Sequence, residues 1–235
     1  HKCVVIADDL TGGNATGVMI SGYGYDTYSI VNMEGLDPNN MPECDCIVYP
    51  TNSRQVNSDT AYKLVYNATK FFMNENISVY SKRIDSTLRG NLGSETDAML
   101  DALDNDAIAM VVPCFPQANR VIIGGYVLVN GVPLHKTEAA ADPLASINTP
   151  LPSLLFRKQS KYDIGSIMVD DMMYGVDYIS DKIKLYKKEG KRIIIFDSLT
   201  QDDMDLVAEA VIKSGVNFIT VDPGIFTATV VSKLV

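Results

Sequence analysis

The chain has 235 residues, of which 46% are hydrophobic, and its formal net charge at pH 7 is −9. This length predicts one large domain, or one and a half small ones, with a sizeable core. The acidic balance argues against nucleic acid and anionic membranes as partners, because both require broad basic surfaces. No apolar run approaches the roughly 20 residues that cross a bilayer. An anionic small molecule stays compatible with this charge, since it needs only a local cationic pocket.

The cysteines indicate neither a zinc site nor a disulfide framework. Cys44 and Cys46 are close together but lack a second pair of ligands, and the other two cysteines lie in strand-like runs. We therefore expect free thiols, no metal site in this chain and a cytoplasmic location.

Apolar strands alternate with helical patterns through the first half of the chain. Residues 4–7 form a continuous apolar run, typical of a parallel strand that is buried on both faces. The other elements predicted here are strands 26–31, 46–49, 77–81 and 107–112, and helices 15–21, 59–74 and 92–103.

The residues Gly12 and Gly13 lie between the first predicted strand and helix, and the pattern allows two interpretations. In one, the glycines let the backbone approach an anion at the start of the helix. In the other, this is a plain turn in which Asp and Thr side chains cap the helix.

The second half begins with a hairpin over residues 125–134, whose turn is Asn130-Gly131. Irregular structure is expected over 135–159, followed by strands 165–169, 192–196 and 217–221 and helices 178–189, 202–214 and 227–235. The fold class is therefore α/β, with a mainly parallel sheet and helices on both faces, as in a Rossmann-like three-layer sandwich. We expect two α/β portions, about 1–134 and 160–235, joined by the irregular, proline-containing loop. No glycine or polar tail caps the last helix, which favours a domain from a longer protein.

Polar residues follow the predicted strands and should gather at one edge of the sheet, where open α/β sheets bind ligands. The densest group is the segment 82–91, Lys-Arg-Ile-Asp-Ser-Thr-Leu-Arg-Gly-Asn. The candidate site residues are Asp8, Asp9, Thr11, Arg54, Lys82, Asp85, Ser86, Thr87, Arg89 and Arg120.

This group suits a small acid that carries hydroxyls. Arginine binds a carboxylate through two parallel hydrogen bonds, and Asp and Ser side chains hold hydroxyl groups. Asp85 or Asp9 could act as the general base on a hydroxyl, and the remaining candidates would bind substrate. The alternatives are helix capping for Asp85-Ser86-Thr87 and a solvated surface charge for Lys82 or Arg83.

Four motifs resemble the four-carbon acid sugar kinase family in order and spacing. They are Ala7-Asp8-Asp9-Leu10-Thr11-Gly12, the segment 82–91, Pro113-x-Phe115-Pro116 with Arg120, and Asn130-Gly131-x-Pro133-Leu134-x-x-Thr137. The resemblance implies ATP-dependent phosphorylation of the terminal hydroxyl of threonate, erythronate or a 3-oxo-tetronate. It also implies that this chain is the amino-terminal domain that binds the sugar acid. ATP and Mg²⁺ would be bound mainly by a carboxyl-terminal nucleotide-binding domain that these residues do not include.

The chain departs from the family pattern at three places. Gly13 and Ala15 change the run after the first strand, and Val121-Ile122 replace a hydroxyl-bearing pattern after Arg120. Near the end, Asp222-Pro223-Gly224 stands where the family tends to a Gly/Ser-rich turn that meets the nucleotide.

Two other functions compete with the kinase. A phosphatase of the haloacid dehalogenase type needs a second Asp two residues after its nucleophile, whereas Leu10 follows Asp8 at that spacing and Thr11 follows Asp9. A non-catalytic protein that binds or senses sugar acids is the second alternative, and a homodimer is compatible with the sequence. A further α/β domain with Gly-rich phosphate loops after residue 235 would favour the kinase.

Overall fold

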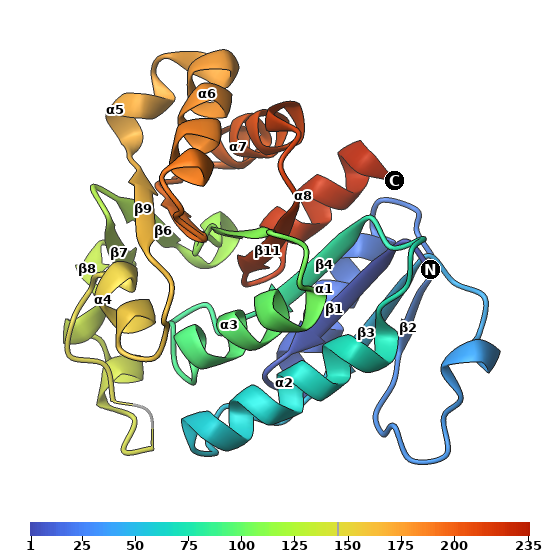
Figure 1. Ribbon diagram of the computed structural model, residues 1–235. Coiled ribbons are helices and arrows are strands. Elements are labelled where there is room, and N and C mark those ends of the chain that lie inside the picture. Colours follow the sequence, from blue (N-terminus) through green and yellow to red (C-terminus); the bar gives the residue numbers. More distant parts are fainter. Residues whose placement is uncertain (145) are drawn as a thin grey trace.

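A computed structural model describes residues 1–144 and 146–235 (Figure 1). In this described part, eight strands form one sheet in which every neighbouring pair is parallel. The order across the sheet is β2 (Thr27–Ser29), β3 (Cys46–Pro50), β1 (Cys3–Ala7), β4 (Val79–Arg83), β11 (Phe218–Asp222), β5 (Ile108–Val111), β10 (Ile193–Phe196) and β9 (Ile164–Ile167).

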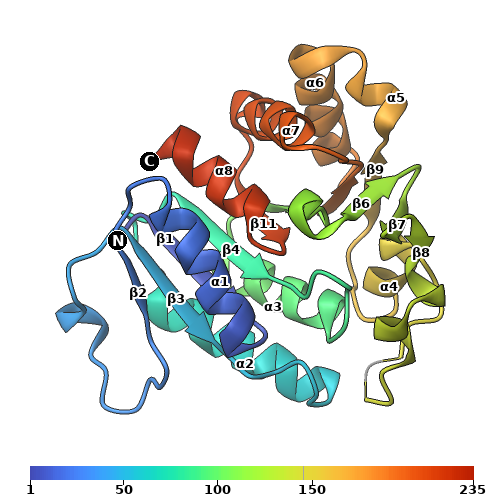
Figure 2. The ribbon, with the colours of Figure 1, turned by 180° about the vertical axis from the view of Figure 1, so that it is seen from behind.

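Helices cover both faces of this sheet, as Figures 1 and 2 show from opposite sides. The helices on one face are α1 (Leu10–Ser21), α6 (Gly175–Lys188), α7 (Gln201–Ser214) and α8 (Ile225–Leu234). Those on the other are α2 (Ser58–Phe72), α3 (Leu92–Leu103) and the short α4 (Pro152–Arg157). The connections β3–α2–β4 and β4–α3–β5 cross the sheet in one direction, and β9–α6–β10 and β10–α7–β11 in the other. Because such crossovers are right-handed, the helices of these two groups must lie on opposite faces of the sheet. The predicted three-layer fold class is confirmed.

Local sequence explains where the helices begin and which side they bury. In α2 the residues Ala61, Val65, Ala68 and Phe72 recur at helical spacing and are buried, and the side chain of Asn57 caps the first turn. In α7 the side chain of Thr200 caps the N-terminus together with that of Asp203, and Gly215 ends the helix at φ 69°.

The predicted start of the first helix at residue 15 is wrong, because α1 begins at Leu10. The carboxylate of Asp9 accepts a hydrogen bond from the backbone N–H of Gly12 at 3.0 Å and so caps the helix. Gly12 and Gly13 lie in its first turn, and a Cβ atom at Gly13 would stand 3.1 Å from the side chains of Ala7 and Val48. The glycines therefore let the helix pack against the sheet and against Arg83, as described below.

A smaller antiparallel sheet, β6 (Arg120–Ile123), β7 (Tyr126–Val129) and β8 (Val132–Pro133), lies beside the main one. Asn130 and Gly131 adopt φ angles of 51° and 75° between β7 and β8, which confirms the predicted Asn-Gly turn. The remaining short elements are α5 (Val169–Met172) and the 3₁₀ turns η1 (Pro38–Asn40), η2 (Pro116–Ala118), η3 (Leu134–Lys136) and η4 (Glu138–Ala141). Strands from residues 1–134 and 160–235 share the main sheet, with β11 inserted between β4 and β5.

The reversal of the winding direction marks a topological switch point between β1 and β4. The chain leaves β1 toward the β3 side of the sheet, whereas it leaves β4 toward the β5 side. Ligands of open α/β sheets bind outside the carboxyl ends of strands at such a switch point. Asp8 and Asp9 follow β1 at this point, and Asp85 follows β4 closely. Among the described residues, no helix is both long enough and apolar enough to cross a membrane.

Candidate functional site

Three carboxylates and three guanidinium groups meet at this switch point. We refer to them as the acid–guanidinium cluster, which consists of Asp8, Asp9, Asp85, Arg54, Arg83 and Arg89. Their formal charges cancel, and each carboxylate forms an ion pair with at least one arginine. Desolvated charges are tolerated at such a place only when they are paired and hydrogen-bonded.

Arg54 is the central member of the cluster. Its Nε donates to Oδ2 of Asp8 at 2.8 Å and its Nη2 to Oδ1 of Asp8 at 3.3 Å. The same Nη2 lies 3.1 Å from Oδ1 of Asp9 and 3.9 Å from Oδ1 of Asp85. Burial would lower the pKa of Arg54, but the hydrogen bond and charge of Asp8 outweigh it and raise that pKa. Because Asp8 is almost fully buried and gripped by Arg54, it does not suit the role of a phosphatase nucleophile.

Arg83 joins the ends of β1 and β4. Its Nη1 donates to Oδ1 of Asp9 at 3.3 Å and lies 3.8 Å from Oδ1 of Asp8. The guanidinium lies against the first turn of α1, where a Cβ atom on Gly12 would come within 1.6 Å of Nη1. Glycine at position 12 is therefore required for this arginine to occupy its place. The Nε of Arg83 is buried and has no hydrogen-bond partner among the described residues.

Asp85 is the most strongly bonded carboxylate of the cluster. Its Oδ2 accepts hydrogen bonds from Oγ1 of Thr87 at 2.6 Å and from Nε of Arg89 at 2.7 Å. Burial would raise the pKa of Asp85, but these bonds and the charge of Arg54 lower it to about 2. Asp85 is therefore ionised throughout the physiological range.

The loop after β4 has an unusual backbone that fixes this geometry. Leu88 and Gly90 have φ angles of 62° and 107°, in the left-handed region. A Cβ atom at Gly90 would stand 3.2 Å from Cγ of Arg54 and 3.4 Å from Oδ2 of Asp8, so this loop lies directly on the cluster. The side-chain amide of Asn91 donates to the carbonyls of Ser53 and Val56 at 3.0 and 2.9 Å. These bonds tie the loop after β4 to the loop after β3.

Lys82, which we expected to bind substrate, lies inside the protein with no exposed surface. Its ammonium donates to the carbonyls of Ile6 and Arg83 and lies 3.3 Å from Oε1 of Glu95. Burial raises the pKa of Glu95, against the charge of Lys82 and a hydrogen bond from Ser53. Because strand residues alternate between faces, Lys82 points toward the α3 layer rather than along the edge.

The other candidates are arranged less tightly. Thr11 is exposed on the first turn of α1, and Ser86 is half-buried in the loop after β4. Thr87 is buried and bonded to Asp85. Arg120 begins β6 in the smaller sheet, where its Nη1 donates to the carbonyl of Ala118 at 2.6 Å and contacts no member of the cluster.

Further polar residues border the cluster beyond those expected from the sequence. A cavity of about 280 Å³ opens on the cluster, lined by Asp8, Asp9, Asn52, Arg54 and Gln55. Asn52 is exposed and has a φ angle of 51°, a strain that clusters at functional sites. Asp142, from the segment after the small sheet, lies 3.4 Å from Nη1 of Arg89. No local pattern marks Asn52, Gln55 or Asp142. Arg83 lies within the segment 82–91, and the interpretation of it as a solvated surface charge is wrong, because Arg83 is buried.

The cluster does not suit a divalent cation, because each of its carboxylates already faces a guanidinium.

The turn before α8 does not suit a phosphate group either. The buried carboxylate of Asp222 accepts hydrogen bonds from the backbone N–H groups of Gly224 at 2.7 Å and Thr227 at 3.1 Å. Burial raises the pKa of Asp222 despite these bonds. A carboxylate of the protein thus occupies the position that an anion would take at this helix start.

A comparison with family models matches residues 3–230 to the sugar-binding N-terminal domain. The chain belongs to this family. The D-erythronate kinase of Heliobacterium modesticaldum is 40% identical over 95% of this chain and 51% of its own length. The D-threonate kinase of Salmonella typhimurium is 34% identical over 89% of this chain and 48% of its own length. The resemblance to four-carbon acid sugar kinases is therefore confirmed, and the chain spans about half the length of these relatives.

Among solved structures, a domain of unknown function from Bordetella bronchiseptica has the same fold. Its TM-score is 0.83 at 23% identity, and the match covers 99% of this chain and 56% of that chain. That protein was crystallised with bound citrate as a domain-swapped dimer. At 23% identity, this comparison shows that the two proteins share a fold, and it carries no conclusion about function.

Proposed function

We propose that this chain binds a four-carbon sugar acid at the acid–guanidinium cluster and is the sugar-binding half of an ATP-dependent kinase. The observation that carries this proposal is the meeting of three arginines and three aspartates beside a cavity of about 280 Å³ at the switch point of the sheet. The names of the two kinases reported above support a tetronate as the substrate class.

The residues divide into two roles in this proposal. Arg54, Arg83 and Arg89 present N–H groups that bind a carboxylate in the plane of the guanidinium. The carboxylate oxygens of Asp8 and Asp85, with the hydroxyls of Thr11, Ser86 and Thr87, hold the substrate hydroxyls. Lys82 supports the site from within the core, and Arg120 contributes only if the small sheet approaches the cluster when substrate binds.

Asp9 suits the general base better than Asp85. A base is efficient when its pKa lies near the working pH, and the pKa of Asp85 is lowered to about 2. Asp9 is also the most exposed of the three carboxylates, with 31% of its side chain accessible, so a substrate hydroxyl can reach it. In the proposed reaction Asp85 orients the substrate, and Asp9 accepts the proton of the terminal hydroxyl as that oxygen bonds to the γ-phosphorus of ATP and ADP leaves.

ATP and Mg²⁺ would be bound by a second domain. Two observations support this assignment. The chain spans only about half the length of the kinase relatives. At the start of α8, the carboxylate of Asp222 already occupies the position where a phosphate group would bind. The four cysteines are free thiols, which supports a reducing, cytoplasmic location. We extend the proposal to a homodimer, for which the Bordetella bronchiseptica structure provides one precedent.

The test is calorimetric titration of D-erythronate, D-threonate and a 3-oxo-tetronate into the chain and its variants. Asp85→Asn and Arg89→Ala should each weaken tetronate binding by about tenfold or more, because each removes a charged hydrogen-bonding partner. Arg157→Ala, which removes an exposed arginine outside the cluster, should leave the affinity unchanged. Melting curves report whether the variants are folded. Unchanged affinity in both cluster variants would refute the site.

A further inference from the structure

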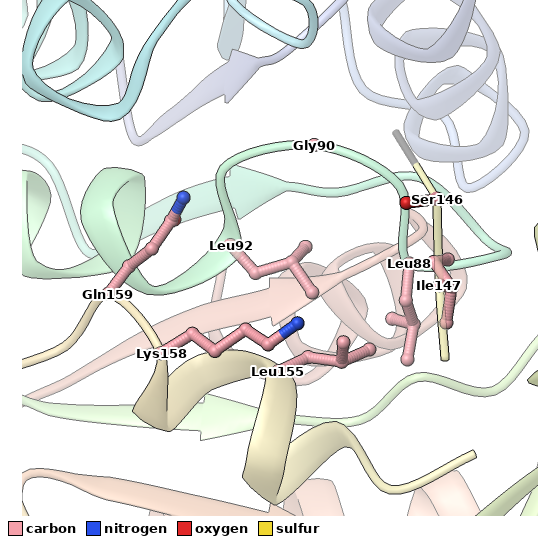
Figure 3. Close-up of a pocket in the computed structure, with 8 residues that line it drawn as sticks. All are labelled: Leu88, Gly90, Leu92, Ser146, Ile147, Leu155, Lys158 and Gln159. Atoms are coloured by element: carbon pink, nitrogen blue, oxygen red, sulfur yellow. The ribbon is translucent and has the colours of Figure 1, made fainter. Parts of the chain in front are cut away.

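A second cavity, of about 180 Å³, lies beside the loop that follows β4 (Figure 3). Its walls come from that loop, from residues 146 and 147 and from the end of α4. The lining residues are Leu88, Gly90, Leu92, Ser146, Ile147, Leu155, Lys158 and Gln159. None of these residues belongs to the acid–guanidinium cluster.

The lining is mixed: Leu88, Leu92, Ile147 and Leu155 are apolar, whereas Ser146, Gln159 and one cation, Lys158, are polar. Figure 3 shows Lys158 extending across the cavity, its ammonium between the side chains of Leu92 and Leu155. Among the described residues Lys158 has no ion-pair partner, although the chain as a whole is acidic. The amide of Gln159 is already engaged, since its Oε1 accepts from the N–H of Ser94 and its Nε2 donates to Asn91. Lys158 is therefore the charged group that a ligand would meet.

We propose that this cavity is a second ligand site and binds a short-chain aliphatic monocarboxylate, such as butyrate or isobutyrate. The carboxylate would pair with the ammonium of Lys158, and the carbon chain would contact Leu92 and Leu155. A volume of about 180 Å³ equals roughly six water molecules at ~30 Å³ each, which suits a small acid.

Such a ligand would also act on the acid–guanidinium cluster through a shared loop. Leu88 and Gly90 line the cavity, and Gly90 separates it from Arg54 and Asp8. Arg89 lies between them in the chain and bonds to Asp85. An occupant that packs against Leu88 stabilises this left-handed loop conformation, so the cluster loses less freedom when the tetronate binds. Only this coupling rests on the proposed function; the carboxylate site does not.

The first experiment is a titration of isobutyrate, followed by calorimetry or by NMR shifts of the amides at residues 88–92. Saturable binding with millimolar affinity is expected, and isobutyramide, which has the same carbon skeleton without the charge, should bind about tenfold more weakly. Lys158→Gln should weaken isobutyrate binding by a similar factor. Arg157→Gln is the matched control, because this neighbouring cation on α4 does not line the cavity.

A second variant tests the cavity without removing the charge. Leu155→Trp should fill the space and abolish isobutyrate binding while the melting temperature is retained. The site is refuted if isobutyrate shows no saturable binding, if Lys158→Gln binds it as tightly as the parent chain, or if isobutyramide competes equally.

The coupling is tested by titrating D-erythronate with and without saturating isobutyrate. A several-fold tighter affinity for D-erythronate is expected in its presence, and an unchanged affinity would refute the coupling. A chain that binds isobutyrate but no tetronate would contradict the proposed function alone. A chain that binds D-erythronate but not isobutyrate would contradict the second site alone.

Discussion

The ammonium of Lys82 lies 3.3 Å from Oε1 of Glu95, and both side chains are withdrawn from solvent immediately behind the acid–guanidinium cluster. Ser53, next to Arg54 in the chain, donates to the same Glu95 oxygen at 2.7 Å. The carbonyl of Arg83 accepts from the ammonium at 2.8 Å. The pair therefore connects the ends of β3 and β4 to α3.

Removing one member of this pair should be costly. Lys82→Met or Glu95→Leu leaves an uncompensated buried charge, and each should lower the free energy of unfolding by about 3–5 kcal/mol. The double variant should lose much less than the sum, because no charge is left unpaired. Urea unfolding of the parent chain and the three variants measures this cycle. Lys184→Met, on the exposed Lys184–Asp181 pair, is the control and should change nothing measurable. Additive losses would show that the two side chains act independently.

Asp85 should make stability depend on pH below neutrality. Its pKa in the folded chain is lowered to about 2 from an ordinary value of 3.8, a difference worth about 2 kcal/mol. For a lowered carboxylate pKa, the stabilisation is complete above pH ~4 and is lost as the pH falls through ~2. The difference in unfolding free energy between the parent chain and Asp85→Asn should shrink accordingly over this range.

The comparison with Asp85→Asn is needed because other carboxylates act in the opposite direction. Burial raises the pKa of Glu95, Asp97, Asp197 and Asp222, so these groups favour the folded state as the pH falls. Subtracting the variant from the parent chain removes their shared contribution. A difference that stays constant from pH 5 to pH ~2 would contradict the lowered pKa of Asp85.

The sequence predicted the parallel sheet and its two helical layers because the strands are continuous apolar runs and the helices have apolar faces. It also predicted the meeting of Asp8, Asp9, Arg54, Asp85 and Arg89, since residues at the carboxyl ends of parallel strands share one edge. Whether these residues bind a ligand stays a prediction.

Three features required the three-dimensional structure. The pattern of residues around Lys82 gives no sign that its partner is Glu95, because the two residues meet through the packing of α3 on β4. The start of α1 was misplaced because Gly12 and Gly13 have low helix propensity, whereas packing on the sheet and the cap from Asp9 decide the structure. Asp142 reaches Arg89 from a segment with no periodic pattern at all.

Gly12 should tolerate alanine poorly although it lies in a helix. A Cβ atom there would come within 1.6 Å of Nη1 of Arg83, so Gly12→Ala should displace the arginine from Asp9 and weaken tetronate binding. Gly17→Ala in the same helix is the matched control, because its Cβ atom would make only ordinary contacts at 3.4 and 3.8 Å. The control should gain about 0.5–1 kcal/mol of stability from the better helix former. Melting curves and tetronate titrations of both variants decide this, and equal behaviour would contradict the packing of Arg83.

Asp142→Asn should tighten tetronate binding. With Asp142 included, the carboxylates around the cluster outnumber the guanidinium groups by one, and Nη1 of Arg89 lies 3.4 Å from Oδ2 of Asp142. Neutralising this carboxylate frees the positive charge of Arg89 for the substrate. Because both side chains are partly exposed, the gain should be modest, about two- to fivefold in affinity.

Salt dependence separates this electrostatic effect from a change in loop structure. The gain should shrink when the ionic strength rises from 0.01 M to 0.5 M, because screening shortens the reach of the exposed charges. Asp171→Asn, which removes a carboxylate paired with Lys182 on α6, is the control and should leave tetronate affinity unchanged at both salt concentrations. A weaker affinity in Asp142→Asn would instead mean that Asp142 holds Arg89 in the orientation that the substrate requires.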